Sequence, residues 1–286
     1  MPTIPPPPPP STPREPHLAR RLAESFGADP ERYDRTRPRY PAELVDRIAA
    51  AAPGPDLLDV GIGTGVSARP FAAAGCRVLG VEADARMAAF ARARGFDVEV
   101  GRFERWDPAG RSFDAIVAGQ TWHWIDPAAG AAKAAALLRP RGLLALFWNV
   151  QQPPPELARS FAEVYRRLLP DTPFAAAPTD SLDACDRILG PTTAGIRATG
   201  AFAEPERWQF AWTQPYTTSE WLDQVPTFGG HSRLPPATLE QLLAGIGDAV
   251  DAAGGRFTMT YATVAIVAAS ASAAARRPAA PAPGVP

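Results

Sequence analysis

A glycine-rich turn directly follows a short apolar segment of the chain, and this pair limits the possible folds. Residues 57–60 are apolar apart from Asp59, and Gly61, Gly63 and Gly65 follow at every second position. Glycine adopts positive φ without steric cost and lets the backbone approach a ligand closely. A strand that ends in such a turn and continues into a helix is typical of a βαβ unit with a ligand at the turn.

The segments around the turn alternate between two patterns. Strand-like segments occupy residues 57–60, 77–81, 96–100, 113–118 and 143–150, and helix-like segments occupy residues 41–51, 66–74, 85–94 and 128–138. Short strands that alternate with helices of about ten residues indicate a parallel sheet with helices on both faces. Right-handed crossovers then predict a doubly wound α/β fold.

The pattern changes after residue 150. Helices are expected at 156–169, 181–189, 218–223 and 237–253, and strands at 207–213 and 256–268. We expect the two late strands to join the same sheet, which gives seven mostly parallel strands, and the helices within about 216–253 to form a small cap. The domain is predicted to span 18–270. The proline-rich ends, 1–17 and 271–286, are predicted to be disordered tails, His17 included.

Composition excludes several classes of protein. The net charge is −1, so the basic surface that nucleic-acid binding requires is missing. No apolar run approaches the roughly 20 residues of a membrane span, and no secretory signal is recognisable. Two cysteines and three histidines stand in no metal-binding spacing, so no metal is expected. These features favour a cytoplasmic location and leave the oligomeric state open.

The spacing of the turn indicates which ligand it binds. A dinucleotide-binding turn reads G-x-G-x-x-G, whereas here the third glycine comes one residue early, and no lysine follows to make a phosphate-binding P-loop. Glu82 lies 17 residues after Gly65, at the end of the next strand, where a carboxylate can accept hydrogen bonds from two ribose hydroxyls. Asp59 can face an ammonium group. A ligand with a ribose and an amino-acid tail fits both acids.

With these residues the sequence resembles the class I S-adenosylmethionine-dependent methyltransferases. LLDVGIGTG at 57–65 resembles their first motif, FDAIV at 113–117 their fourth strand, and LLRPRGLL at 137–144 their fifth helix–strand junction. The segments at 33–41, 122–124 and 254–257, followed by Tyr261, resemble a narrower group, the methyltransferase type 11 or trans-aconitate methyltransferase-like enzymes. The resemblance implies a Rossmann-like methyltransferase fold and S-adenosylmethionine as cofactor.

The resemblance also implies a set of cofactor-binding residues. Beside Asp59, Glu82 and the three glycines, these are Tyr33, Arg37, Ala83, Met87, Phe103, Glu104, Gln120 and Thr121. Helical spacing alone would place Met87 in the core. Arg102 departs from the family, because many members carry an acid there toward the adenine amine. A backbone contact from Phe103 could replace that acid.

The acceptor side is expected around Trp122, His123 and Trp124, directly after the fourth strand. Tyr40, Trp122, Trp124 and His231 are predicted to line the substrate pocket. His123 is the candidate general base, because an ordinary histidine has a pKa near 6.5. The alternative for His123 is a packing role in the loop.

These observations predict methyl transfer to a small-molecule acceptor by direct in-line displacement. The Asn/Asp-Pro-Pro-Tyr signature of enzymes that methylate exocyclic amines is missing, since Gly119, Gln120, Thr121 and Trp122 stand in its place. Two alternatives remain open at this point. One is a catalytically silent S-adenosylmethionine-binding regulatory or scaffold protein. The other is a nicotinamide oxidoreductase, which the early third glycine disfavours.

Overall fold

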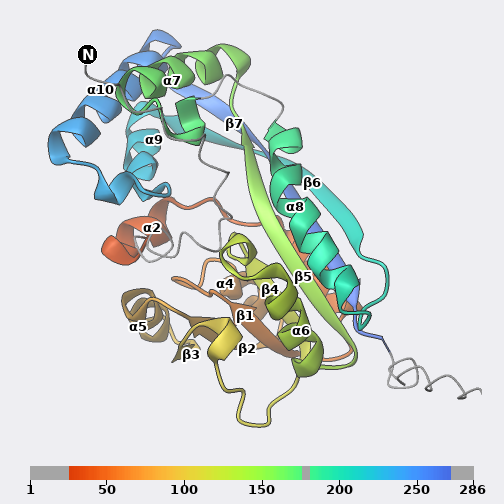
Figure 1. Cartoon of the computed structure of the whole chain (residues 1–286). Helices are drawn as coiled ribbons and strands as arrows, with labels where there is room; N and C mark the ends of the chain where they lie inside the picture. The colour runs from red at the N-terminus through yellow and green to blue at the C-terminus, as the bar shows by residue number, and fades with distance from the viewer. Residues whose placement is uncertain (1–25, 176–180, 272–286) are drawn as a thin grey trace, which may run out of the picture.

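The strands form one seven-stranded sheet in the computed structural model, which describes residues 26–175 and 181–271 (Figure 1). The strands are β1 (Asp56–Val60), β2 (Arg77–Glu82), β3 (Asp97–Val100), β4 (Phe113–Gly119), β5 (Leu138–Gln152), β6 (Glu206–Thr217) and β7 (Arg256–Ala269). Their order is β3-β2-β1-β4-β5-β7-β6, and β7 runs antiparallel to the other six strands. The predicted fold class is confirmed. The predicted tails, with His17, lie outside the described residues, apart from Ala271.

Helices cover both faces of the sheet. The α-helices are α2 (Pro30–Thr36), α3 (Ala42–Ala51), α4 (Ala68–Ala73), α5 (Ala85–Ala93), α6 (Pro127–Leu137), α7 (Pro155–Leu168), α8 (Ser181–Ala198), α9 (Thr218–Gln224) and α10 (Pro236–Ala252). Strand alternation divides the core between the faces. Along β4, Ile116 and Ala118 pack on the side of α6 and α8, whereas Ala115 and Val117 pack on the side of α3 and α4.

The cap stands at the edge of the sheet where the parallel strands end. β5, β6 and β7 are longer than the other strands, and their extensions reach α7, α9 and α10 (Figure 1). Tyr216 of β6 and Tyr261 of β7 pack there among apolar side chains of these three helices, and their hydroxyls lie 2.8 Å apart. The cap therefore contains α7 in addition to the helices at 216–253 that the sequence predicts.

Two helices differ from the sequence prediction. α8 continues to Ala198, past Pro191, instead of ending at residue 189. Leu189, before that proline, and Ile196, after it, are both buried in the core. This packing offsets the loss of the hydrogen bond that proline cannot donate. α2 overlaps the start of the segment 33–41, where no helix is predicted. Asp29 caps it by accepting a hydrogen bond from the Arg32 amide, and Pro30 opens it.

Within the described ranges no helix has the length and apolarity that crossing a membrane requires. The same residues contain no group of three His, Cys, Asp or Glu side chains that could hold a metal ion.

Candidate functional site

A cavity of about 540 Å³ opens at the carboxyl ends of the parallel strands, bordered by α2 and by cap residues. Small-molecule sites usually measure roughly 300–1,000 Å³ and lie at this edge of such sheets. The predicted site residues that line it are Tyr33, Arg37, Gly61, Gly63, Glu82, Ala83, Met87, Phe103, Glu104, Gln120, Thr121, His123 and Trp124. A smaller adjoining pocket adds Tyr40 and shares Arg37, Gly61 and Gly63 with the main cavity.

The three glycines of the turn have positive φ, but each meets a different environment. A Cβ at Gly61 would lie 2.2 Å from the Thr121 side chain, and one at Gly65 would lie 2.8 Å from Phe96. These two glycines therefore allow close packing within the protein. A Cβ at Gly63 would meet nothing closer than 3.7 Å, and Gly63 borders the cavity. Gly63 is the position where the backbone can approach a ligand, whereas Gly65 does not line the cavity.

Glu82 is held in place by the turn itself. Its Oε2 accepts a hydrogen bond from the Gly63 amide at 2.9 Å, and its Oε1 accepts one from the Asp84 amide at 2.8 Å. Burial raises the pKa of Glu82, while the two backbone donors favour the charged form. Each carboxylate oxygen keeps a further lone pair for a ligand. Glu82 therefore faces the cavity as a pre-oriented acceptor.

Asp59 lies beneath the turn and does not border the cavity. Its side chain is fully buried, and its Oδ2 accepts a hydrogen bond from the Ser67 hydroxyl at 2.6 Å. Its Oδ1 has no hydrogen-bond partner among the described residues. Burial raises the pKa of Asp59 from its ordinary 3.8 to about 7. The sequence predicts direct contact between Asp59 and a ligand ammonium group. In the structure Asp59 is buried and does not line the cavity, so this prediction is not supported by its position.

Arg37 follows α2 and enters the cavity among aromatic rings. Its guanidinium carbon lies 4.6 Å from the centre of the Tyr33 ring and 5.7 Å from that of Phe228. A terminal nitrogen donates to the Thr227 carbonyl, and the buried Nε has no partner within the described chain. No carboxylate of the described residues pairs with this guanidinium. Arg37 therefore brings an uncompensated positive charge to the cavity.

His123 lines the cavity from a short 3-10 helix, η4 (Trp122–Trp124). Its Nδ1 lies 3.1 Å from Nε1 of Trp148, and its ring lies 4.6 Å from that of Trp124. Burial lowers the pKa of His123 from 6.5 to about 4. At neutral pH His123 is therefore an uncharged ring.

This pKa shift makes the stability of the protein depend on pH. Between pH 6.5 and about 4 the unfolded chain binds a proton at His123 that the folded chain does not, so the free energy of unfolding falls as the pH drops. The shift is worth up to about 3 kcal/mol, at about 1.4 kcal/mol per pKa unit. We expect urea unfolding to show that, between pH 7 and pH 4, the free energy of unfolding falls by up to this amount more in wild type than in His123→Gln. The comparison cancels the opposite trend of Asp59, and parallel pH curves for the two proteins would contradict the shift.

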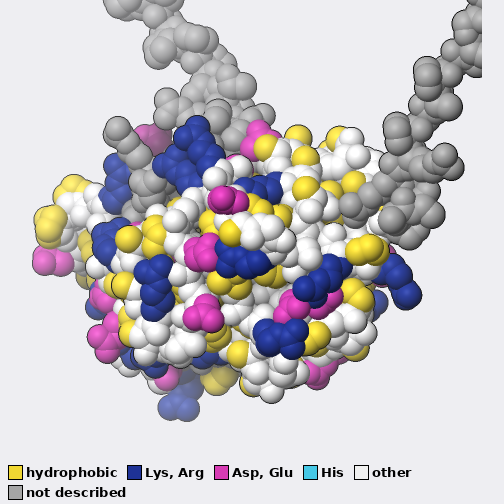
Figure 2. Space-filling model, turned by 90° about the horizontal axis from the view of Figure 1, so that it is seen from below, with side chains coloured by type: hydrophobic (Ala, Val, Ile, Leu, Met, Phe, Trp, Pro, Cys, Tyr) yellow, Lys and Arg dark blue, Asp and Glu magenta, His cyan; other side chains and the backbone are white. Residues whose placement is uncertain are grey.

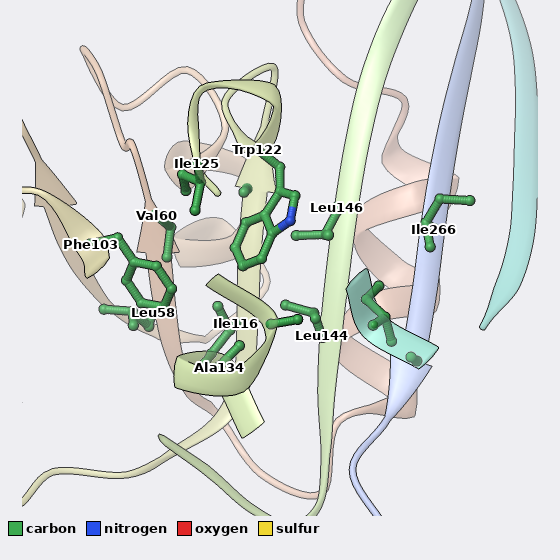
Figure 3. Close-up of a cluster of buried hydrophobic side chains, with 14 of the residues drawn as sticks. Leu58, Val60, Phe103, Ile116, Trp122, Ile125, Ala134, Leu144, Leu146 and Ile266 are labelled. Carbon is green, nitrogen blue, oxygen red and sulfur yellow. The ribbon is translucent and has the colours of Figure 1, made fainter. Parts of the chain in front are cut away.

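Trp122 does not line the cavity, which corrects the sequence prediction. Its ring is fully buried and points into the core between Phe103, Ala134 and Leu146 (Figure 3). The 3-10 turn sends the adjacent side chains in different directions, so Trp122 enters the core while His123 and Trp124 border the cavity.

His231 also lies outside the cavity lining. It is buried in the cap, where its Nε2 lies 3.0 Å from the Tyr165 hydroxyl. The predicted pocket role of His231 is therefore not supported by its position.

Several cavity residues were not predicted from the sequence: Phe26, Asp84, Trp148, Asn149, Gln151, Phe174, Ile188 and Phe228. The ends of β2 and β5 could have indicated Asp84, Asn149 and Gln151, because residues after parallel strands lie at this edge.

Comparison with known proteins identifies the family. A family model described as a methyltransferase domain matches residues 58–146. Relatives from Mycobacterium bovis and Mycobacterium tuberculosis, each called an uncharacterized methyltransferase, are 30% identical over 208 residues, which cover 72% of this chain and 77% of the relative. The chain belongs to the class I S-adenosylmethionine-dependent methyltransferases. These relatives do not confirm the narrower resemblance to the trans-aconitate group, and they support neither of the two alternative functions.

A solved structure supports the fold of this methyltransferase. A proposed type II methyltransferase from Anaeromyxobacter dehalogenans aligns with a TM-score of 0.59 and 24% identity over 81% of this chain and 97% of that chain.

The residues present fit S-adenosylmethionine. Both carboxylate oxygens of Glu82 can accept hydrogen bonds from a ligand. Gly63 leaves open a space beside the backbone that a Cβ would fill. Arg37 supplies a cation without a carboxylate partner in the described chain, and Phe103 and Glu104 line the β3 side of the cavity. The methyltransferase therefore carries groups suited to a ribose, an amino-acid tail and an adenine.

Gly63→Ala tests the role of the turn. The new methyl group meets no protein atom within 3.7 Å, so the fold should survive apart from a strain of roughly 1–2 kcal/mol at positive φ. We expect binding of S-adenosylhomocysteine, measured by calorimetry, to weaken at least tenfold. Gly75→Ala is the matched control, since Gly75 also has positive φ, with open space around it, and lies outside the cavity. Equal affinities in the two variants would remove Gly63 from the site.

Proposed function

We propose that this methyltransferase transfers a methyl group to a small-molecule acceptor by direct in-line displacement. The observation that carries the proposal is that one continuous cavity is lined by Glu82, at the end of β2, and by aromatic residues near the cap, among them Phe174 and Phe228. Its size is that of a small-molecule site, and α2 and the cap border it. A cytoplasmic location and a domain that spans 18–270 stay predictions.

The cofactor, when bound, supplies a methyl group on a positively charged sulfur. Glu82 is proposed to accept the ribose hydroxyls, and Arg37 to pair with the carboxylate of the amino-acid tail. Tyr33, Ala83, Met87, Phe103, Glu104, Gln120 and Thr121 are proposed to complete the cofactor site, since all line the cavity. Positioning of this kind supplies several kcal/mol through proximity and orientation.

Helix α2 is proposed to close the cofactor side of the cavity. Asp223 of α9 pairs with Arg32 at 3.0 Å and with Arg35 at 2.9 Å, so α2 is tied to the cap. Exposed ion pairs are worth only about 0–1 kcal/mol and weaken with salt. We expect Asp223→Asn to change the free energy of unfolding by less than about 1 kcal/mol and to speed the release of S-adenosylhomocysteine in stopped-flow measurements. An unchanged release rate at low salt would contradict this role for α2.

Neither the net charge nor the charge distribution on the face drawn in Figure 2 supports a nucleic-acid substrate. The net charge is −1, and Figure 2 shows Lys and Arg side chains interspersed with Asp and Glu on the face that it draws. Nucleic-acid binding depends on concentrated positive charge that displaces counterions.

Methyl transfer from radiolabelled S-adenosylmethionine into a cell extract tests the proposal. We expect label to enter the small-molecule fraction with wild type and to be reduced strongly with Glu82→Ala. Label confined to protein or nucleic acid would contradict the acceptor class. Binding of the cofactor without any turnover would favour the silent regulatory alternative.

A further inference from the structure

Trp148 determines which nitrogen of His123 carries the proton. The indole Nε1 of Trp148 lies 3.1 Å from Nδ1 of His123. An indole N–H donates a hydrogen bond and cannot accept one. Nδ1 must therefore be the acceptor, and the neutral imidazole carries its proton on Nε2.

The Nε2–H group of His123 is available to a ligand. The ring lines the cavity, and no hydrogen bond from the described chain reaches Nε2. Desolvation is the sole cause of the lowered pKa of His123, so no charged neighbour promotes its protonation. A ring with a protonated Nε2 and an occupied Nδ1 has no free lone pair with which to remove a proton.

The carboxylates that line the cavity lie on one of its sides. Glu82 ends β2, and Asp84 and Glu104 follow β2 and β3, where Arg102 also lines the cavity. The polar lining groups on the side of His123 and the cap are Arg37, Thr121 and the amides of Gln120, Asn149 and Gln151. Within the described residues, no carboxylate lines the cavity next to His123. Among the described residues, this side of the cavity therefore offers a guanidinium, a hydroxyl and amide groups, and no acidic side chain that could act as a base.

Building on the proposed function, we infer that His123 is a fixed hydrogen-bond donor and that Trp148 is the positioning residue that fixes its tautomer. The acceptor molecule then presents an unprotonated oxygen, of the carbonyl, carboxylate or phenolate class, to the Nε2–H group. His123 selects the acceptor molecule by this hydrogen bond and does not act as a general base.

Nitrogen-15 NMR of the full chain tests the tautomer directly. The chain has three histidines, so comparison with His123→Gln identifies the His123 signals. We expect the Nε2–H tautomer, with no titration between pH 7.5 and pH 5.5. Trp148→Phe should give a mixture of tautomers and a midpoint closer to 6.5. Trp212→Phe is the matched control, because that indole donates to Thr263 and not to a histidine. An Nδ1–H tautomer or a midpoint near 6.5 in wild type would overturn the inference, even if Trp148→Phe does not fold.

Simple probes test the class of acceptor. The protein is first saturated with S-adenosylhomocysteine, and failure at this step counts against the proposed function, not against the tautomer. Benzoate should then shift the Nε2–H proton signal of His123, and toluene should not. Equal responses to the two probes, or no response to millimolar benzoate, would overturn the assignment of an oxygen to this contact.

Discussion

Replacing Glu82 by alanine is expected to weaken S-adenosylhomocysteine binding at least tenfold. Each hydrogen bond to a charged group contributes about 1.5–3 kcal/mol, and 1.4 kcal/mol corresponds to a factor of ten in affinity. The carboxylate is pre-oriented by the amides of Gly63 and Asp84, so little entropy is lost when it accepts two hydroxyls. Calorimetric titration of the full chain measures the change.

Glu204→Ala is the control for the Glu82 variant. Glu204 pairs with Arg197 on the surface and does not line the cavity, so its removal should leave the affinity unchanged. A second comparison uses a ligand that lacks the ribose hydroxyls. It should bind wild type and Glu82→Ala with similar affinity. If Glu82→Ala bound the natural product as tightly as wild type, the carboxylate would have another role.

Trp122→Ala is expected to lower the free energy of unfolding by roughly 3–5 kcal/mol, the usual cost of removing a large buried aromatic side chain. The ring is fully buried, and Gly130 of α6 gives it room, since a Cβ there would lie 3.1 Å from the indole. Urea unfolding monitored by circular dichroism measures the loss.

Two further variants separate a core role of Trp122 from a pocket role. Trp122→Phe keeps most of the apolar ring and removes an indole N–H that has no partner in the described chain, so it should cost much less than Trp122→Ala. Trp124→Ala should change stability little, because Trp124 is half-buried beside the cavity. If Trp122→Ala were as stable as wild type but bound ligand differently, Trp122 would line the pocket and the core role would be wrong.

The parts of the site that the sequence predicted are those with a local pattern. The glycines at every second position and the acid at the end of the next strand predicted the turn and Glu82, because strand and turn geometry place both at the same sheet edge. Strand alternation and helical periodicity predicted the elements of the sheet to within a few residues, apart from the longer β5 and β6.

The remaining features depend on contacts between distant segments. Helix α8 continues past Pro191 because its apolar residues pack on the core, which local propensity cannot show. The orientation of neighbouring side chains on the 3-10 turn at Trp122 and His123 follows from packing, not from their order in the chain. The start of α2 does have a local signal, because an aspartate at the N-cap, Asp29, followed by proline, Pro30, is typical of a helix start.

A calorimetric titration of the full chain with S-adenosylhomocysteine and with NAD tests the cofactor assignment. We expect one S-adenosylhomocysteine to bind per chain and NAD to give no heat of binding. A chain that binds NAD and not S-adenosylhomocysteine would contradict both the site at Gly63 and Glu82 and the function built on it.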